Sequence, residues 1–248
     1  MNNKLNDEEK RSMLESIAII SYNMREKIYL DYFDKLDPKY KCILALFDDS
    51  FMSSLMVCEC LKNAAVAQSA VILRLLLESV SIIHIISEHS ELLDEYRKHF
   101  NIRMEIASNP KKEREILKKH FPEVDDRKIL SYMDYGWIHS LTNNSPSEKE
   151  MIKLANLGDV IEWKNQYLDK LTHQSFSTTN MIGESGDFPI VEIFIQILGK
   201  LFDYLCCDFH KLTNFDFVID GKDMFQGWFR PHYMKLFRIN EKNNDSKL

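Results

Sequence analysis

The sequence predicts an all-α protein, an antiparallel bundle of long helices followed by a small aromatic-rich C-terminal appendage. Glycine and proline are scarce, with only 7 and 6 in 248 residues, so the chain has few of the turns that many short strands would need. Hydrophobic residues make up 45% of the chain and charged residues 28%, an ordinary globular balance that provides a sizeable core. Apolar positions recur at helical spacing along most of the chain.

Two amphipathic helices are predicted at the start. The first covers residues 7–35, and Pro38 ends it and opens a second helix that runs to about Leu61. Their apolar sides carry Met13, Ile17, Ile20, Met24, Ile28 and Phe33, and then Ile43, Leu46, Phe47, Phe51, Leu55 and Cys58. Short connections favour antiparallel packing of these two helices with the next one.

The central helix is the stretch 63–88, NAAVAQSAVILRLLLESVSIIHIISE, which is apolar on nearly every side. Such a helix is buried, because exposing it would leave a large apolar area in water. One narrow stripe is polar, and in it Arg74 and Glu78 stand one turn apart and can pair. A charged pair in a core helix is costly unless it is satisfied, so this pair is either a structural fastener or part of a site.

Shorter and more polar segments are predicted next, because Pro110 and Pro122 interrupt the helical pattern. The helices expected here cover 90–107, 111–120 and 125–138. Residues 141–148, LTNNSPSE, form the clearest predicted loop of the chain. Ser147 with Glu150 resembles a capping box for the helix that follows.

Two further long helices are expected over 159–179 and 190–209, which completes a helical bundle domain spanning residues 1–210. Residues 211–248 are predicted to form a separate appendage, dense in aromatic side chains and ending in a disordered tip. The Asp-Gly pair at 220–221 is a turn signal that could join two short strands into a hairpin.

Composition limits the classes of function that the protein can have and indicates where in the cell it is located. The net charge of −6 argues against wholesale binding to nucleic acid or anionic lipid but leaves room for a local basic patch. The five cysteines form no CxxC, which favours reduced buried thiols over a zinc site. The polar start MNNKLNDEEK is no signal peptide, and the central helix carries Arg74, Glu78 and His84 within its span. We therefore expect a cytoplasmic protein with no membrane crossing, no metal and no cofactor.

His173, in LDKLTHQSFSTTN, is one candidate for chemistry. Asp169 lies one helical turn before it and could orient the imidazole or share a metal ion. Two ligands do not make a zinc site, which needs three or four. A solvated helix face is the plainer interpretation of the same two residues.

A basic segment around 111–120 is a second candidate. Interleaved acidic residues make a solvated surface helix the simpler interpretation, with phosphate or RNA contact as the alternative. Within it, Arg114 and His120 fit an R-x(4-6)-H spacing, which is an alternative catalytic pair. The aromatic tail is a satellite core cluster or an interface, and as an interface it would serve a homo-oligomer or a protein partner.

Several of these stretches together resemble an uncharacterised all-helical bacterial family. Its leucine-rich helix has arginine followed four residues later by glutamate, as in LRLLLES, and a later helix ends in tyrosine and then histidine, as in YLDKLTHQS. The matching positions are Arg74, Glu78, Tyr96, Trp137, Leu154, Ala155, Tyr167 and His173, within residues 10 to 205. Such proteins are similar to the HEPN superfamily, helical bundles that include RNA-cleaving toxins, anti-phage abortive-infection effectors and inactive nucleotide-binding relatives.

The resemblance implies a protein that binds or cleaves RNA or nucleotides in stress or phage defence. It implies a site in which His173 is a general acid or base, Arg74 stabilises a phosphate and Glu78 fixes Arg74. The expected reaction is a metal-independent attack of a ribose 2′-hydroxyl on the adjacent phosphate, using His173 or His120. The alternative is a non-enzymatic binding or scaffolding module in which Arg74 and Glu78 are structural. The sequence leaves open whether the protein is an enzyme.

Overall fold

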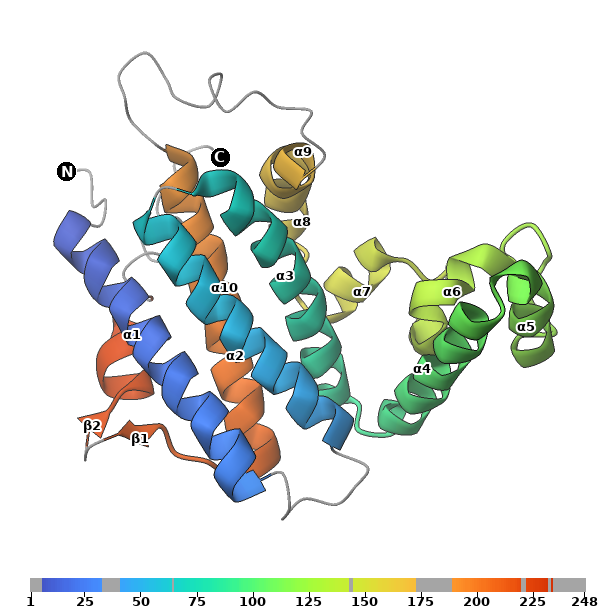
Figure 1. The fold of residues 1–248 in the computed structure, drawn as a ribbon, viewed down its shortest axis with the longest axis horizontal. Coiled ribbons are helices and arrows are strands. Elements are labelled where there is room, and N and C mark those ends of the chain that lie inside the picture. The colour runs from blue at the N-terminus through green and yellow to red at the C-terminus, as the bar shows by residue number, and fades with distance from the viewer. Residues whose placement is uncertain are drawn as a thin grey trace, which may run out of the picture.

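The computed structural model describes residues 6–32, 41–63, 65–142, 145–172, 189–219, 222–231 and 233. Within these ranges the protein is all-α apart from one short hairpin, which confirms the predicted fold class. Four long helices lie side by side as a bundle (Figure 1). They are α1 (Asp7–Lys27), α2 (Lys41–Lys62), α3 (Val66–Glu88) and α10 (Pro189–Thr213).

Local signals set where α1 begins. The Asn6 side chain accepts a hydrogen bond from the backbone N–H of Glu9 (2.8 Å), and the Glu9 carboxylate accepts one from the Asn6 N–H (3.1 Å). This capping box satisfies two N–H groups that the first turn cannot pair within the helix. A π-helical turn over Ile28–Tyr32 continues α1 beyond Lys27.

The core helix α3 packs against both α2 and α10. Among its fully buried side chains are Leu73, Val80 and Ile83, each 0% exposed. By length and composition alone this one described helix could cross a membrane. In the fold it packs against α2, α10 and the short helices that precede α10, but Val71 and Leu75 are 42% and 57% exposed, so one side of its apolar circumference faces solvent.

The C-terminal appendage docks on the bundle. Strands β1 (Val218–Ile219) and β2 (Lys222–Asp223) pair antiparallel, which confirms the hairpin expected around the Asp-Gly pair. A π-helical turn over Phe225–Phe229 follows. Its Phe229 ring is 0% exposed and meets the ring of Phe202 on α10 at 5.2 Å. The described aromatic rings of the tail therefore extend the bundle core.

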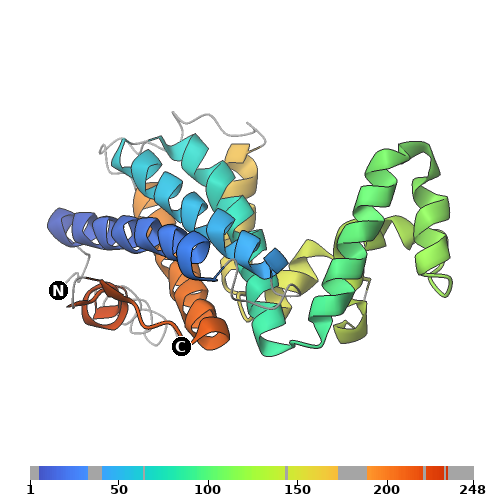
Figure 2. The ribbon, with the colours of Figure 1, turned by 60° about the horizontal axis from the view of Figure 1, so that its bottom comes forward.

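An arm projects from the bundle beyond the end of α3, as Figures 1 and 2 show from two directions. Its elements are α4 (Leu92–Ser108), a 3₁₀ turn (Pro110–Lys112), α5 (Glu113–His120), a 3₁₀ turn (Ile129–Ser131), α6 (Tyr132–Tyr135) and a 3₁₀ segment (Gly136–Leu141). The arm has its own small apolar core, formed by Ile102, Ile106, Ile116, Leu117, Val124, Ile129 and Tyr132. The sequence did not predict this second centre of packing.

The continuous helix expected over 125–138 is wrong, because the region breaks into short turns. Asp125 accepts a hydrogen bond from the backbone N–H of Arg127 (2.8 Å), and the Ser131 hydroxyl donates to the carbonyl of Lys128 (2.8 Å). Such local side-chain bonds offer the backbone an alternative to the helical ladder.

The segment between the arm and α10 packs on α3. It contains α7 (Glu148–Leu154), α8 (Val160–Trp163), a π-helical turn (Lys164–Leu168) and α9 (Asp169–Thr172). The single helix expected over 159–179 is therefore interrupted by a π turn, and its part from residue 173 lies outside the described residues. Ser147 caps α7 by accepting from the Glu150 N–H (3.3 Å). The Glu150 carboxylate pairs instead with Lys153 (2.9 Å), so only half of the expected capping box forms.

Candidate functional site

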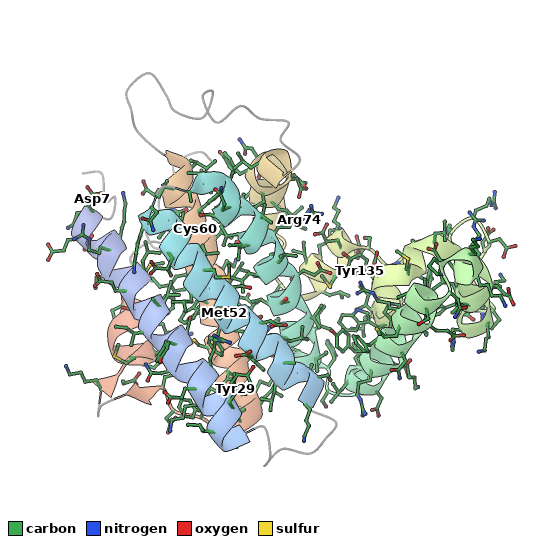
Figure 3. The ribbon with its side chains drawn as sticks, viewed as in Figure 1. Asp7, Tyr29, Met52, Cys60, Arg74 and Tyr135 are labelled. Carbon is green, nitrogen blue, oxygen red and sulfur yellow. The ribbon has the colours of Figure 1, made fainter. Side chains whose placement is uncertain are left out.

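Arg74 faces α7 and α9 rather than pairing along its own helix, and Figure 3 marks its place on α3. Its Nε lies 3.6 Å from Oδ1 of Asp169 and 4.0 Å from Oε1 of Glu148. No ion pair among the described residues joins Arg74 to Glu78. The pairing suggested by the i,i+4 spacing is replaced by contacts to two other elements.

Lys164 completes this arrangement, and its role was missed from the sequence. Its ammonium lies 3.0 Å from Glu148 and 2.9 Å from Asp169, and only 7% of its side chain is exposed. The π turn that begins at Lys164 sets residues five apart on the same side of the segment, and Lys164 and Asp169 are five apart. We call Arg74, Glu148, Lys164 and Asp169 the four-charge network. Its two cations and two anions balance, as a fastener of α3, α7 and α9 requires.

Glu78 lies one turn further along α3 and lines a small hollow of about 30 Å³ at the junction of bundle and arm. Burial and the nearby Glu148 carboxylate raise the pKa of Glu78 above its ordinary range. Tyr135 stands near it, and burial together with Glu78 raises the pKa of the Tyr135 phenol. The guanidinium groups of Arg103 and Arg74 lower the pKa of Glu78, but they do not outweigh the effect of burial.

Three residues of the family resemblance converge at this hollow. Glu78, Tyr96 and Trp137 all line it, and the Tyr96 and Trp137 rings meet edge to face at 5.2 Å. Burial raises the pKa of Tyr96 to about 12, so its phenol stays protonated at neutral pH. The junction is where residues far apart in the sequence come together.

Other predicted site residues are placed differently. His173 lies outside the described residues, so its role stays a prediction. Asp169, one turn before it, reaches Arg74, so at that position the polar side of the segment does face α3. Arg114 and His120 both lie on α5, six residues apart, which sets them about 120° apart around the helix. His120 lines a cavity in the arm, and Arg114 is not part of that lining.

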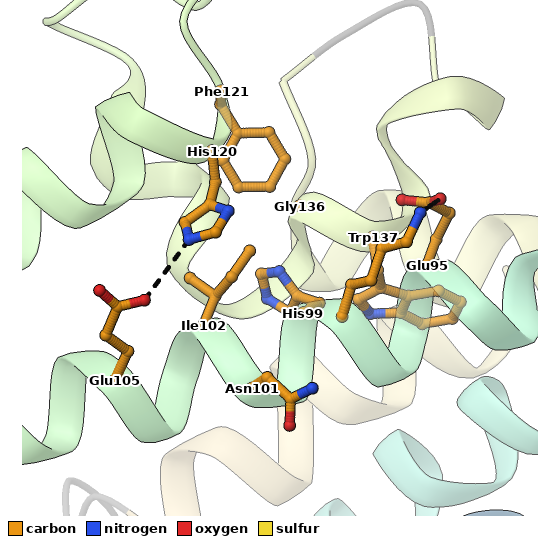
Figure 4. Close-up of a pocket in the computed structure, with 10 residues that line it drawn as sticks. Glu95, His99, Asn101, Ile102, Glu105, His120, Phe121, Gly136 and Trp137 are labelled. Carbon is orange, nitrogen blue, oxygen red and sulfur yellow. Dashed lines mark hydrogen bonds and ion pairs between the residues drawn. The ribbon is translucent and has the colours of Figure 1, made fainter.

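That cavity is an open groove of about 470 Å³ in the arm, between α4, α5 and the segment after α6. Figure 4 shows the His99 and His120 imidazoles directed toward the same space, with the rings of Phe121 and Trp137 beside them. The lining is completed by Glu95, Lys98, Asn101, Ile102, Glu105 and Gly136. His99 and Trp137 also line the small hollow beside Glu78, so the two cavities share a wall.

His99 is the most informative residue of the groove. Its side chain is buried, and its Nε2 lies 2.8 Å from the backbone carbonyl of Met133. A carbonyl only accepts, so Nε2 carries the proton and donates it. Burial lowers the pKa of His99, which keeps the ring neutral and leaves a bare lone pair on Nδ1. That Nδ1 is buried and has no hydrogen-bond partner among the described residues.

Gly136 packs closely against the rings of His99 and Phe121. A Cβ atom at this position would stand 3.3 Å from Nδ1 of His99 and 2.8 Å from Cζ of Phe121. Any larger residue would therefore crowd the Nδ1 lone pair and the aromatic wall together. The groove depends on a glycine at this point of the chain.

The charges of the groove are largely matched. Glu95 pairs with Lys98 at 2.6 Å, and Glu105 lies 3.5 Å from Nε2 of His120 and 3.7 Å from Lys119. The neutral His99 acceptor thus stands among balanced ion pairs. The burial of His99 could have been predicted from the sequence, because His99 occupies an apolar position of α4, in line with Leu92, Ile102 and Ile106.

Cations without an ion pair gather at the far end of the arm. On the 3₁₀ turn before α5, on α5 itself and on the loop after it, Lys111, Lys112, Arg114 and Lys128 have no acidic partner among the described residues. Residues 92–141 hold 10 of the 32 Lys and Arg and 9 of the 38 Asp and Glu, a net charge of +1. The rest of the chain holds 22 and 29, a net charge of −7. An anion approaching the protein is therefore favoured at the arm.

Metal-capable side chains gather at one place in the described part of the chain. His84 and Glu88 on α3 and Asp208 on α10 each bring one ligand atom within 4.8 Å of the others. All five cysteines are free thiols, and Cys58 and Cys206 are buried.

Comparison of the chain with protein-family models, with curated proteins and with solved structures finds no match in any of the three. The resemblance to the HEPN superfamily consequently stays a prediction, and the function has to be argued from the site.

Proposed function

We propose that the protein binds RNA, accepting one nucleotide unit in the arm groove beside His99. The observation that carries this proposal is the buried Nδ1 of His99, an acceptor without a partner among the described residues, in a side chain that lines a groove of about 470 Å³. An unpaired buried acceptor is costly, and a ligand that donates a hydrogen bond to it recovers that cost. The groove volume falls within the range of about 300–1,000 Å³ that is usual for small-ligand sites.

The lining fits a nucleotide better than other anions. The rings of Phe121 and Trp137 line the groove and offer aromatic contacts for a base, and base–aromatic stacking is typical of single-stranded RNA binding. An exocyclic amino group or a ribose 2′-hydroxyl supplies the donor that His99 lacks. The unpaired cations at the far end of the arm offer contacts for phosphates that extend beyond the groove.

The same groups support strand cleavage without a metal. In this reaction Nδ1 of His99 takes the proton of a ribose 2′-hydroxyl, whose oxygen attacks the adjacent phosphorus. The bond to the 5′-oxygen of the next nucleotide breaks, and His120 returns a proton to that oxygen. The products are a 2′,3′-cyclic phosphate and a free 5′-hydroxyl. A phage-defence or stress role rests on the family resemblance alone.

The test is binding and cleavage of a fluorescein-labelled single-stranded RNA, with EDTA present throughout. His99→Gln is the key variant, because the Gln amide can still donate to the Met133 carbonyl while the Nδ1 acceptor is lost. His120→Ala removes the second histidine of the groove, the proposed proton donor. His89→Ala is the matched control, since 45% of the His89 side chain is exposed and it lies outside the groove. Loss of one hydrogen bond weakens binding about 5-fold, the equivalent of about 1 kcal/mol.

Equal RNA affinity in wild type, His99→Gln and His120→Ala would overturn the proposal. Cleavage that disappears in both groove variants even at RNA concentrations that saturate their weakened binding assigns the histidines to catalysis. Binding without cleavage by the wild type limits the protein to a binding role. Affinity should also fall as salt rises, because the Lys and Arg side chains displace counterions from the RNA phosphates.

A second candidate function is a non-enzymatic scaffolding module, and the four-charge network favours it. Arg74 meets two carboxylates there, which leaves little charge for a substrate phosphate. In this case the partner is a second copy or another protein, and the C-terminal aromatic segment is the proposed contact. Sedimentation equilibrium of the full chain tests self-association, and a monomer across micromolar concentrations contradicts the homo-oligomer.

A further inference from the structure

A second polar cluster, separate from the arm groove, lies between two bundle helices. His84 and Glu88 stand one turn apart on α3, so both point to the same side of the helix. Asp208 faces them from α10. Metal sites in helical bundles are built in this way, from side chains on facing helices.

Asp208 is a buried carboxylate whose negative charge a bound cation would compensate. It is 3% exposed, and its two carboxylate oxygens lie 3.0 and 3.2 Å from Nδ1 of His84. That ring nitrogen is its one hydrogen-bond partner among the described residues. One N–H serves a carboxylate with about four acceptor positions, so the buried charge is poorly compensated.

The spacing of the three ligand atoms is close to what a small divalent ion needs. Zinc bonds of about 2.0–2.1 Å in a tetrahedron set neighbouring ligand atoms about 3.3 Å apart. The His84 to Asp208 distances are already 3.0 and 3.2 Å, and all three atoms lie within 4.8 Å. A small opening of the His84–Asp208 contact and a turn of the Glu88 side chain are enough to receive the ion.

We propose that His84, Asp208 and Glu88 bind a zinc-class divalent ion, with one position left for water. An imidazole with two carboxylates suits zinc or cobalt better than magnesium or calcium, which prefer oxygen ligands alone. The Tyr204 ring packs edge to face on the His84 imidazole at 4.7 Å and fixes its orientation. This site shares no residue with the groove, so metal binding and RNA binding succeed or fail separately.

The ammonium group of Lys211 competes with a metal ion for the Glu88 carboxylate. This ammonium lies 2.7 Å from Oε1 of Glu88, and this contact lowers the pKa of Glu88. The ion therefore binds against a neighbouring positive charge, so Lys211→Met should tighten the metal.

The experiment uses the untagged full chain, first treated with EDTA and dialysed, then titrated with Zn²⁺ and Co²⁺. Co²⁺ in a four-coordinate site gives visible absorption bands that are far stronger than those of free Co²⁺ and lie at longer wavelength, and this readout requires no activity. At zinc concentrations about 100 times Kd, Tm should rise by about 5–10 °C. His84→Ala and Asp208→Asn should each weaken binding at least about 10-fold, since even second-shell changes cost that much.

His89→Ala is the matched control, because this exposed histidine also contacts a carboxylate, Glu91, at 3.3 Å. Metal binding should be unchanged in this variant. The proposal is overturned if the wild type shows neither the cobalt bands nor the rise in Tm. It is equally overturned if His84→Ala and Asp208→Asn bind as tightly as the wild type, which places the metal elsewhere.

Discussion

The four-charge network predicts that Lys164→Met is strongly destabilising. The ammonium of Lys164 is the close cation for Glu148 and Asp169, at 3.0 and 2.9 Å, and its side chain is 7% exposed. Methionine keeps the apolar stem but leaves the two carboxylates with Arg74 alone, at 4.0 and 3.6 Å. Breaking a fully buried ion pair costs about 3–5 kcal/mol.

Solvent reduces that figure here. The side chains of Glu148 and Asp169 are 24% and 27% exposed, so water partly stabilises them once the lysine is gone. We therefore expect a loss of about 2–3 kcal/mol in the free energy of unfolding, measured by urea titration. Adding Glu148→Gln to Lys164→Met should recover part of this loss, because it removes one of the stranded charges.

Lys153→Met is the matched control. Its ammonium also pairs with a glutamate, Glu150, at 2.9 Å, but 49% of its side chain is exposed. Such a surface pair contributes about 0.5 kcal/mol or less. If Lys164→Met and Lys153→Met lower stability by the same small amount, the network does not fasten α3 to α7 and α9, and the reasoning is refuted.

Three further predictions concern the core. Burial raises the pKa of Glu78, so the folded state holds its proton more tightly than the unfolded state and this residue costs stability as pH rises past the ordinary glutamate range. Urea titration should find Glu78→Gln more stable than wild type at pH 7 and nearly equal to it at pH 4, whereas a pH-independent difference contradicts the assignment. Burial raises the pKa of the Cys58 thiol to about 12, so a thiol reagent on the native protein should spare Cys58 and react first with partly exposed Cys60, a phase that Cys60→Ser removes. Phe229→Ala should cost about 3–5 kcal/mol, because its ring is 0% exposed. The exposed Phe100→Ala should change stability by about 0.5 kcal/mol or less, and equal losses in the two variants would show that the tail does not belong to the core.

The long helices were predictable because their apolar spacing is a local property of the chain. The stretch around Leu73 could only be a buried helix, and the Asp-Gly pair at 220–221 marks the hairpin between β1 and β2. The ion pairs within the core were harder to predict from the sequence. Arg74 and Glu78 suggested a pair through i,i+4 spacing, but tertiary packing brings other carboxylates closer to Arg74.

The candidate sites depend on contacts that no local pattern encodes. Lys164 becomes buried through a π turn, which propensity does not predict. His84 and Asp208 meet although 124 residues separate them. His99 is the exception, since its place on the apolar side of α4 could have identified a buried histidine. What the spacing could not tell is that Gly136 packs against the Nδ1 side of this ring.

The protonation state of the His99 ring is the most direct test of nucleotide binding in the arm groove, and ¹⁵N NMR of the imidazoles measures it. At neutral pH the His99 ring should be neutral, with a proton on Nε2 and none on Nδ1. Adding a short single-stranded RNA should shift the Nδ1 resonance of His99 and leave that of His89 unchanged. A ring protonated on both nitrogens, or an Nδ1 resonance that RNA does not move, would contradict the proposal that this groove receives a nucleotide.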